Sequence, residues 1–426
     1  MIGTDGDSDD VHLRPHPVMT LHTLKASLVE LRGFGPIGEL WFKLFGLRPS
    51  QRASDLQNCS AVLVVRLDAI GDVVLTSPLL RELRRTLPQA WITLVVQPSV
   101  YNLVELCPHV NEVLTFDVNT RGRKHATLIQ YWRALKLAAT CLWRRRFDLA
   151  INPRSGEDSY RGNLLSYLSG ARWRVGYSVH LLRDGPLQPD PCFERLLTQP
   201  LRDSADQHEV QHNLDTLRAI GCRVESERLE LWLSEDDRRF ADQLLSDEKM
   251  RGPTAILGIC LGAGAQHRIW PLSNFAKVAA WFIEHFSGYV VSVGGIKEYR
   301  MAELLRQELG SRVINITGTT SLRQTAAVLS CCSVYLGNDA GPLHIATAMK
   351  VPVVEISPHP RSGSRTQVNS PVRFGPWGKL SMVLQPDHPL PPCEDCCQSR
   401  EPHCITQVQV ENVQSAIEEL LAKRTR

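Results

Sequence analysis

The stretch SVYLGNDAGPLHIATAMKVPVVEI, residues 333–356, contains a strand, a helix and a second strand in immediate succession. Two short apolar runs, SVYLGN and VPVVEI, flank a segment that predicts a helix from Leu343. This order is typical of a parallel sheet with crossover helices. A turn that only redirects the chain needs glycine or proline, but it does not also need Asp339 and His344. The turn is therefore a candidate site.

The same alternation continues outward from this stretch. Strand-like runs occur between residues 61 and 153 (AVLVVRL, WITLVV, NEVLTF, FDLAINP) and again after residue 254 (AILGICL, YVVSVGG, VINITG). They predict an α/β protein with two successive domains, and ligands of such sheets bind outside the carboxyl ends of the strands. We divide the chain into an extension (1–58), a first domain (59–235), a second domain (254–385) and a tail with a C-terminal helix (386–426).

Composition is that of an ordinary globular protein. The chain has 426 residues, of which 43% are hydrophobic and 22% charged. A formal net charge of +3, from 48 basic and 45 acidic residues, gives no case for a nucleic-acid partner. The N-terminus lacks a basic region followed by an apolar run, and no stretch of about 18 apolar residues occurs. We therefore expect a cytoplasmic protein.

The extension carries its own pattern. We expect the first 20 residues to be disordered and residues 21–47 to form two short amphipathic helices that include Trp41, Phe42 and Phe45. These helices could cover an apolar surface of the protein itself. Alternatively, they could dock peripherally on an anionic membrane surface, where aromatic and leucine side chains enter the interface.

Three motifs fall at predicted strand ends. In RLDAIGDVVLTSPLL, residues 66–80, Gly71 permits a tight turn, and Asp72 is either a helix cap or a functional carboxylate. In LGAGAQHRIWPLSNF, residues 261–275, Gly262 and Gly264 expose backbone N–H groups close to the cation Arg268.

The third motif is the turn at residues 338–341, where a helix N-terminus favours an anion. Gly341 would let a phosphate approach the backbone, and His344 would donate a further hydrogen bond. Asp339 would fix the turn by accepting from neighbouring backbone amides. Each motif could instead be a plain strand-to-helix turn.

The segments VLVVRLDAIGDVVLTSPLLRELRRTLPQAWITLVVQPS, GAGAQHRIWPLSNFAKVAAWF and NDAGPLHIATAMKVPVVEI together resemble glycosyltransferase family 9, the heptosyltransferases of lipopolysaccharide core assembly. The resemblance extends from about residue 61 to the C-terminus. It implies a GT-B fold, in which two Rossmann-like domains face a central cleft. The first would hold the acceptor and the second the nucleotide-sugar donor, with the C-terminal helix crossing back to the first domain.

The resemblance also implies roles for individual residues. Asp72 would be the general base, with Arg66 and Gly71 on the acceptor side. The donor diphosphate would contact Ala340 and Gly341, with His344 nearby, and Glu298 is the nearest match to a ribose contact. Two positions depart from the family pattern, which often has Thr or Ser at residue 340 and Lys at residue 268.

These parts imply an inverting transfer of a sugar to a glycolipid or oligosaccharide acceptor. The expected reaction takes heptose from ADP-heptose to a lipopolysaccharide core or related surface glycan. No metal is expected to be required, because cations and a helix N-terminus can stabilise the departing diphosphate. The alternatives are a nucleotide-sugar epimerase and a catalytically silent nucleotide-sugar binding protein, which Ala340 favours.

The cysteines fall into a tail group and a scattered group. The tail segment PPCEDCCQSREPHCI has a spacing that fits zinc or a disulfide, although we favour reduced thiols; its relevant residues are Cys393, Cys396, Cys397, His403 and Cys404. Eight scattered cysteines are expected to be buried thiols of a reducing compartment.

The basic clusters at 121–124 and 144–146 are either solvated helix ends or contacts for an anionic acceptor or lipid headgroups.

Overall fold

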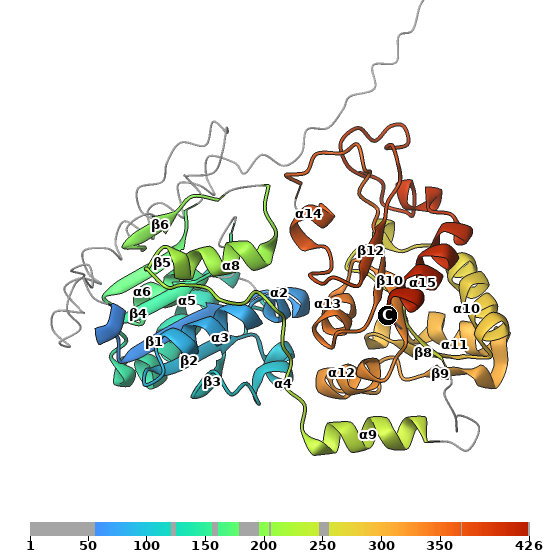
Figure 1. Ribbon diagram of the computed structural model, residues 1–426. Helices are drawn as coiled ribbons and strands as arrows, with labels where there is room; N and C mark the ends of the chain where they lie inside the picture. The colour runs from blue at the N-terminus through green and yellow to red at the C-terminus, as the bar shows by residue number, and fades with distance from the viewer. Residues whose placement is uncertain are drawn as a thin grey trace, which may run out of the picture.

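Two parallel six-stranded sheets, each formed by strands that alternate with helices, make up the protein (Figure 1). The computed structural model describes residues 56–120, 125–155, 161–178, 196–203, 206–246, 255–367 and 369–424. The predicted α/β architecture with two Rossmann-like domains is confirmed. Residues 21–47, for which amphipathic helices are predicted, lie outside the described residues.

The first sheet has the order β3-β2-β1-β4-β5-β6. Its central strand β1 is buried along its whole length, which explains why AVLVVR contains no alternation of polar and apolar residues. The strands are β1 (Ala61–Arg66), β2 (Trp91–Val96), β3 (Glu112–Thr115), β4 (Leu149–Asn152), β5 (Trp173–Tyr177) and β6 (Gln199–Leu201). The helices are α2 (Ile70–Leu75), α3 (Ser77–Thr86), α4 (Tyr101–Val104), α5 (Ala126–Leu137), α6 (Gly162–Leu168) and α8 (Glu209–Arg218).

The second sheet repeats this order as β12-β11-β10-β7-β8-β9. Its strands are β7 (Ile256–Cys260), β8 (Tyr289–Val293), β9 (Val313–Asn315), β10 (Val334–Asn338), β11 (Val353–Ile356) and β12 (Ser381–Leu384). Its helices are α10 (Leu272–Phe286), α11 (Tyr299–Leu309), α12 (Leu322–Ser330), α13 (Gly341–Ala348), α14 (Pro371–Phe374) and α15 (Val410–Arg424). The helix between the two sheets in sequence, α9 (Glu235–Leu245), packs against α12.

The C-terminal helix corrects one expectation. The family resemblance implies that it crosses back to the first domain, but α15 packs on α10 and on strands β10 to β12 of the second domain (Figure 1). Val413 and Ile417 of α15 are fully buried in that domain's core. Arg424 at its end donates to the carbonyls of Cys332 (2.9 Å) and Ser333 (2.7 Å). The apolar face of the helix is therefore covered by the second domain.

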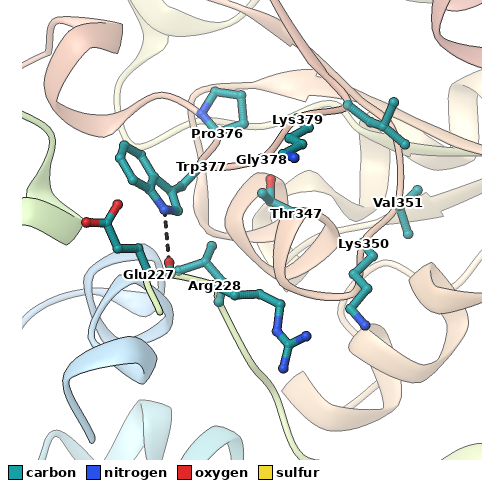
Figure 2. A pocket seen from close by; sticks show the side chains of 11 residues that line it. Glu227, Arg228, Thr347, Lys350, Val351, Pro376, Trp377, Gly378 and Lys379 are labelled. Atoms are coloured by element: carbon teal, nitrogen blue, oxygen red, sulfur yellow. Dashed lines mark hydrogen bonds between the residues drawn. The ribbon is translucent and has the colours of Figure 1, made fainter. Parts of the chain in front are cut away.

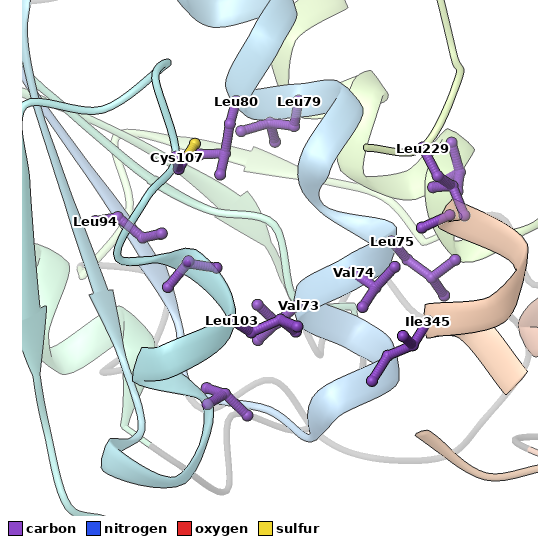
Figure 3. Packing of buried hydrophobic residues seen from close by; sticks show 14 of the residues in the cluster. Val73, Val74, Leu75, Leu79, Leu80, Leu94, Leu103, Cys107, Leu229 and Ile345 are labelled. Atoms are coloured by element: carbon purple, nitrogen blue, oxygen red, sulfur yellow. The ribbon is translucent and has the colours of Figure 1, made fainter. Parts of the chain in front are cut away.

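The two domains meet where α2 lies against α13. A Cβ placed on Gly71 would stand 2.5 Å from Cδ2 of His344, and one placed on Gly341 would stand 2.9 Å from Cβ of Ile70. Each helix thus uses a glycine to admit a side chain of the other. Figure 3 shows the apolar part of this contact, in which Ile345 of α13 faces α2.

Polar contacts join the domains on either side of this helix pair. Arg323 at the start of α12 donates to the carbonyl of Asn102 (3.1 Å) and pairs with Glu105 in the first domain. A segment around α14 also reaches the first domain, where the indole of Trp377 donates to the carbonyl of Glu227 (2.9 Å).

The cysteines scattered outside the tail are mostly buried, and no disulfide occurs among the described cysteines. Cys331 is exposed and Cys141 half-buried, so the prediction of burial is wrong for these two. Cys192 lies outside the described residues. None of the helices that the structure describes is long and apolar enough to cross a bilayer.

The contact between α2 and α13 makes Gly71→Ala destabilising. Alanine gains about 0.5–1 kcal/mol in a helix over glycine, but its methyl group collides with the buried His344 ring, and such overpacking costs about 1–3 kcal/mol. In a His344→Ala background the methyl group has room, so the same substitution should become neutral or stabilising. Denaturant unfolding of the wild type, both single variants and the double variant measures this. An equal cost of Gly71→Ala in both backgrounds would contradict the proposed contact.

Candidate active site

In each sheet the strand order reverses at one pair of neighbouring strands, and all the candidate residues except Glu298 follow those strands. In the first sheet the chain progresses outward from β1 and β4 in opposite directions, and in the second sheet from β7 and β10. Ligands of parallel sheets bind outside the carboxyl ends of the strands at such points. These two points are therefore the expected positions of the site in the two domains.

Arg66, the last residue of β1, is the centre of the first group. Its side chain is only 1% exposed. Its guanidinium lies 3.0 Å from Asp68, 3.1 Å from Asp72 and 2.9 Å from Glu209. It also donates to the side chain of Asn213 (3.0 Å). Because these partners surround its guanidinium, Arg66 positions neighbouring carboxylates rather than offering a free cation.

Asp72 lies in the first turn of α2. One carboxylate oxygen accepts from Arg66, and the other accepts from the backbone N–H of Ala69 (3.2 Å), so the capping interaction expected as an alternative is present. The side chain nevertheless remains 22% exposed. Burial raises the pKa of Asp72; Arg66 opposes this shift and Glu209 adds to it. A cap that is also a partly exposed carboxylate with a raised pKa can act as a base.

Behind Arg66, a chain of buried charges continues to the second domain. Glu209 is 2.9 Å from Arg66 and 3.4 Å from Arg373, which α14 brings across from the second domain. His212 pairs with Asp203 (2.9 Å) and with Glu209 (3.5 Å). Although burial raises the pKa of Glu209, its hydrogen bond from His212 and the charges of the two arginines lower it to about 2. Although burial lowers the pKa of His212, its two carboxylate partners raise it to about 9.

In the second domain, the loops after β7, β8 and β10 converge. The side chain of Glu298 packs directly against Gly262. A Cβ on Gly262 would stand 2.3 Å from Cγ of Glu298. The amide of Asn338 donates to the carbonyl of Gly262 (3.2 Å), and its oxygen accepts from the backbone N–H of Trp270 (2.9 Å). The structure thus brings Gly262 and Glu298 together. Gly264 lies further along the same loop, with Nη1 of Arg268 3.8 Å from the position of its missing Cβ.

Arg268 pairs with the side chain of Asp339 and donates to its carbonyl oxygen (2.9 Å). The expectation that Asp339 accepts from neighbouring backbone amides is therefore replaced by an ion pair. Glu355, at the end of β11, is 1% exposed; burial and the nearby Asp339 raise its pKa well above the ordinary value. Two buried acids therefore lie beside a single arginine.

The start of α13 differs in detail from the expectation. Ala340 is the extended residue before the helix and provides no side-chain cap. The space on the Cβ side of Gly341 is occupied by Ile70, so a phosphate could approach this residue only at its backbone N–H. His344 is 4% exposed against Gly71; burial, with the charge of Arg268, lowers its pKa to about 4. It is therefore neutral at pH 7, and its Nδ1 has no hydrogen-bond partner among the described residues.

An interdomain pocket of about 680 Å³ lies elsewhere (Figure 2). Its lining includes Thr347 and Lys350 at the C-terminal end of α13, Trp377, and Arg228 of the first domain. Val351 and Leu380, also in the lining, lie just before β11 and β12, so the pocket lies at the starts of these strands and away from their carboxyl ends. None of the predicted site residues lines the pocket, so we do not assign the chemistry to it.

Comparison with known proteins agrees with the fold and the motifs. The model of glycosyltransferase family 9 (heptosyltransferase) matches residues 139–399, more than half of the chain. The chain belongs to glycosyltransferase family 9. It is 22% identical over 325 residues to the lipopolysaccharide core heptosyltransferase OpsX of Haemophilus influenzae, covering 76% of this chain and 84% of that one.

Two solved structures are similar to this family 9 chain. The family 9 glycosyltransferase of Veillonella parvula has a TM-score of 0.70 at 22% identity, covering 88% of this chain and 100% of that one. ADP-heptose lipopolysaccharide heptosyltransferase II of Escherichia coli has a TM-score of 0.65 at 19% identity, covering 86% and 100%. The predicted family and GT-B fold are confirmed, and the protein is a glycosyltransferase. The epimerase and silent-binder alternatives are not favoured.

Sequence reasoning missed several buried polar residues of this glycosyltransferase. Glu209, His212 and Arg373 lie far from the motifs in sequence, and no local pattern joins them to Arg66. Glu355 carried a signal, because a carboxylate in the apolar run VPVVEI is unusual for a strand buried on both faces.

Only one of the two basic clusters lies among the described residues, and its three arginines differ in exposure. Arg145 pairs with Glu112 (2.9 Å) and lies over the ring of Trp91, 4.5 Å from its centroid, so it has a structural role. Arg144 and Arg146 are exposed. The cluster at residues 121–124 lies outside the described residues.

The raised pKa of His212 makes stability depend on pH. The folded enzyme binds this proton more tightly than the unfolded chain, so the stabilisation is complete below pH 6.5 and is lost as the pH rises towards about 9. His212→Gln should remove this loss, as measured by denaturant unfolding across that range. His208→Gln is the control, because His208 has a pKa of about 4 and is neutral throughout the window. If the free energy of unfolding of His212→Gln fell with pH as steeply as that of the wild type, this assignment would be contradicted.

Proposed function

We propose that this glycosyltransferase transfers heptose from ADP-heptose to a lipopolysaccharide core or related glycan acceptor, with inversion at the anomeric carbon. The lipopolysaccharide core relative OpsX is named a heptosyltransferase, and the similar Escherichia coli structure is named for ADP-heptose. The observation that carries the proposal is the contact between α2 and α13. It brings the helix that contains Asp72 against the helix that begins beside Arg268 and Asp339.

In this proposal Asp72 is the general base. An acceptor hydroxyl has a pKa far above neutrality, so its attack on the anomeric carbon needs a base in position. The hydroxyl proton passes to the Asp72 carboxylate as the new carbon–oxygen bond forms. The bond from the anomeric carbon to the phosphate oxygen breaks on the opposite face, and its electron pair leaves with ADP. The buried guanidinium of Arg66 orients the Asp72 carboxylate. Gly71 allows α2 to approach α13 of the donor domain.

The donor side would bind the diphosphate without a metal ion in the transfer step. Arg268 and backbone N–H groups of Gly262, Gly264, Ala340 and Gly341 are the proposed contacts for the departing charge. His344 is neutral at pH 7 and would donate a hydrogen bond rather than a charge. Glu298, held against Gly262, would contact the ribose.

We further propose that the enzyme acts in the cytoplasm, in peripheral contact with the anionic inner-membrane surface. The support for this is the apolar and aromatic pattern of residues 21–47. A lipid-linked acceptor would then be presented at the surface where the enzyme binds.

Asp72→Asn tests the base. Transfer should fall by about 10²-fold or more, while donor affinity stays nearly unchanged, because the base acts on the acceptor. Product formation from ADP-heptose and calorimetric titration with ADP give the two measurements. Asp215→Asn, which alters a 37% exposed carboxylate of the same domain, is the matched control and should keep full activity. Activity of folded Asp72→Asn within about tenfold of wild type would remove Asp72 from this role.

His344→Ala tests the diphosphate site. It should weaken ADP binding by about 1–3 kcal/mol, the scale of a hydrogen bond to a charged group. Ala340→Thr, in contrast, should leave binding intact or tighten it, because it adds a hydroxyl beside the same backbone. Calorimetric titration of both variants with ADP decides the matter. Unchanged affinity in folded His344→Ala would place the phosphate contact elsewhere.

A further inference from the structure

The tail of the second domain contains a cluster of thiols around one imidazole. Ligand atoms of Cys393, Cys397, His403 and Cys404 all lie within 4.8 Å of one another. Nδ1 of His403 is 3.6 Å from Sγ of Cys393 and 3.5 Å from Sγ of Cys404. The neighbouring thiol of Cys396 is not part of the cluster. Of the five tail residues singled out from the sequence, four therefore converge and Cys396 does not.

Two sulfur–nitrogen distances in the cluster match the edges of a tetrahedral metal site. Zinc binds thiolate sulfur at about 2.3 Å and imidazole nitrogen at about 2.0–2.1 Å, so a tetrahedron of such ligands has sulfur–nitrogen edges of about 3.5–3.6 Å. Both measured sulfur–nitrogen distances fall in this range. A disulfide is not present among these cysteines.

A cluster of neutral thiols explains the arrangement less well. Nδ1 of a neutral imidazole has one lone pair and accepts one hydrogen bond, yet two sulfurs approach the Nδ1 of His403 equally closely. The backbone also donates to the sulfurs, from Gln398 to Cys393 (3.3 Å) and from Leu390 to Cys404 (3.4 Å). Donors directed at sulfur are the outer-shell interactions that support metal-bound thiolates.

We infer that Cys393, Cys397, His403 and Cys404 bind one zinc ion in a closed structural site. Three thiolates and an imidazole in tetrahedral arrangement favour zinc. Four protein ligands leave no open position for a substrate, so the ion has no part in sugar transfer. This inference does not depend on the proposed function.

The site would join the tail to two other parts of the second domain. Cys404 is fully buried and is followed by Ile405, which belongs to the core that α15 completes. The loop between Cys393 and Cys397 packs against the segment after β11. A Cβ on Gly363 of that segment would stand 2.2 Å from the carbonyl oxygen of Asp395. That segment continues to Arg373, which pairs with Glu209 of the first domain. The ion would therefore stabilise the segment after β11 from which Arg373 reaches the first domain.

Metal analysis of the full chain, purified without chelators, tests the inference. Wild type and Cys396→Ser should each retain about one zinc per chain, whereas Cys397→Ser should lose most of it. Cys397 is chosen because it is only half-buried, while Cys396→Ser is a matched control in the same loop. Equal zinc in wild type and Cys397→Ser, loss of zinc in Cys396→Ser, or iron in place of zinc would each overturn the assignment.

Cobalt provides a second measurement that needs no variant to fold. After removal of zinc, addition of Co²⁺ to the wild type should produce the visible absorption of a tetrahedral thiolate complex, with saturation at about one equivalent. Chelator should also lower the melting temperature of the wild type and of Cys396→Ser, because an ion bound only by the folded state stabilises it. Absence of the cobalt absorption in the wild type would refute the site.

Discussion

The close approach of α2 to α13 is the contact on which the arrangement of the candidate active site depends. It requires glycine on both helices, at Gly71 for the ring of His344 and at Gly341 for Ile70. A side chain at either position would separate the helices, and with them Asp72 and the Arg268 ion pair. Both glycines have ordinary backbone angles, so close packing and not a special turn explains their presence.

Each domain holds one arginine among acids at the point where its strand order reverses. Arg66 lies among Asp68, Asp72 and Glu209, and Arg268 pairs with Asp339 near the buried Glu355. Buried charges stay ionised only when they are paired and hydrogen-bonded, so these clusters fix side-chain orientation. Orientation matters for a base, because proton transfer needs hydrogen-bond distance.

Sequence predicted the features that depend on local pattern and left out those that depend on distant contacts. The buried strand AVLVVR and the strand-to-helix turns at residues 66–80 and 338–341 follow from apolar periodicity and strand-end chemistry. The partnership of Arg66 with Glu209, and of Glu209 with Arg373, joins residues far apart in the chain. The docking of α15 was predicted wrongly from the family resemblance, and its amphipathic pattern could not correct this, because such a pattern shows that a face is buried but not which domain covers it.

Apolar packing and charge have different roles at the domain interface. Val74 and Leu75 of α2 and Ile345 of α13 are fully buried in one apolar cluster that spans both domains, and full burial of such a side chain contributes about 1.5–3 kcal/mol. A buried ion pair such as Arg373 with Glu209 is often neutral or unfavourable against an apolar replacement, whereas removal of one partner costs about 3–5 kcal/mol. Apolar contact therefore supplies most of the attraction between the domains. The ion pair selects one alignment among those that would bury the same surface, because any other alignment leaves a buried charge without its partner.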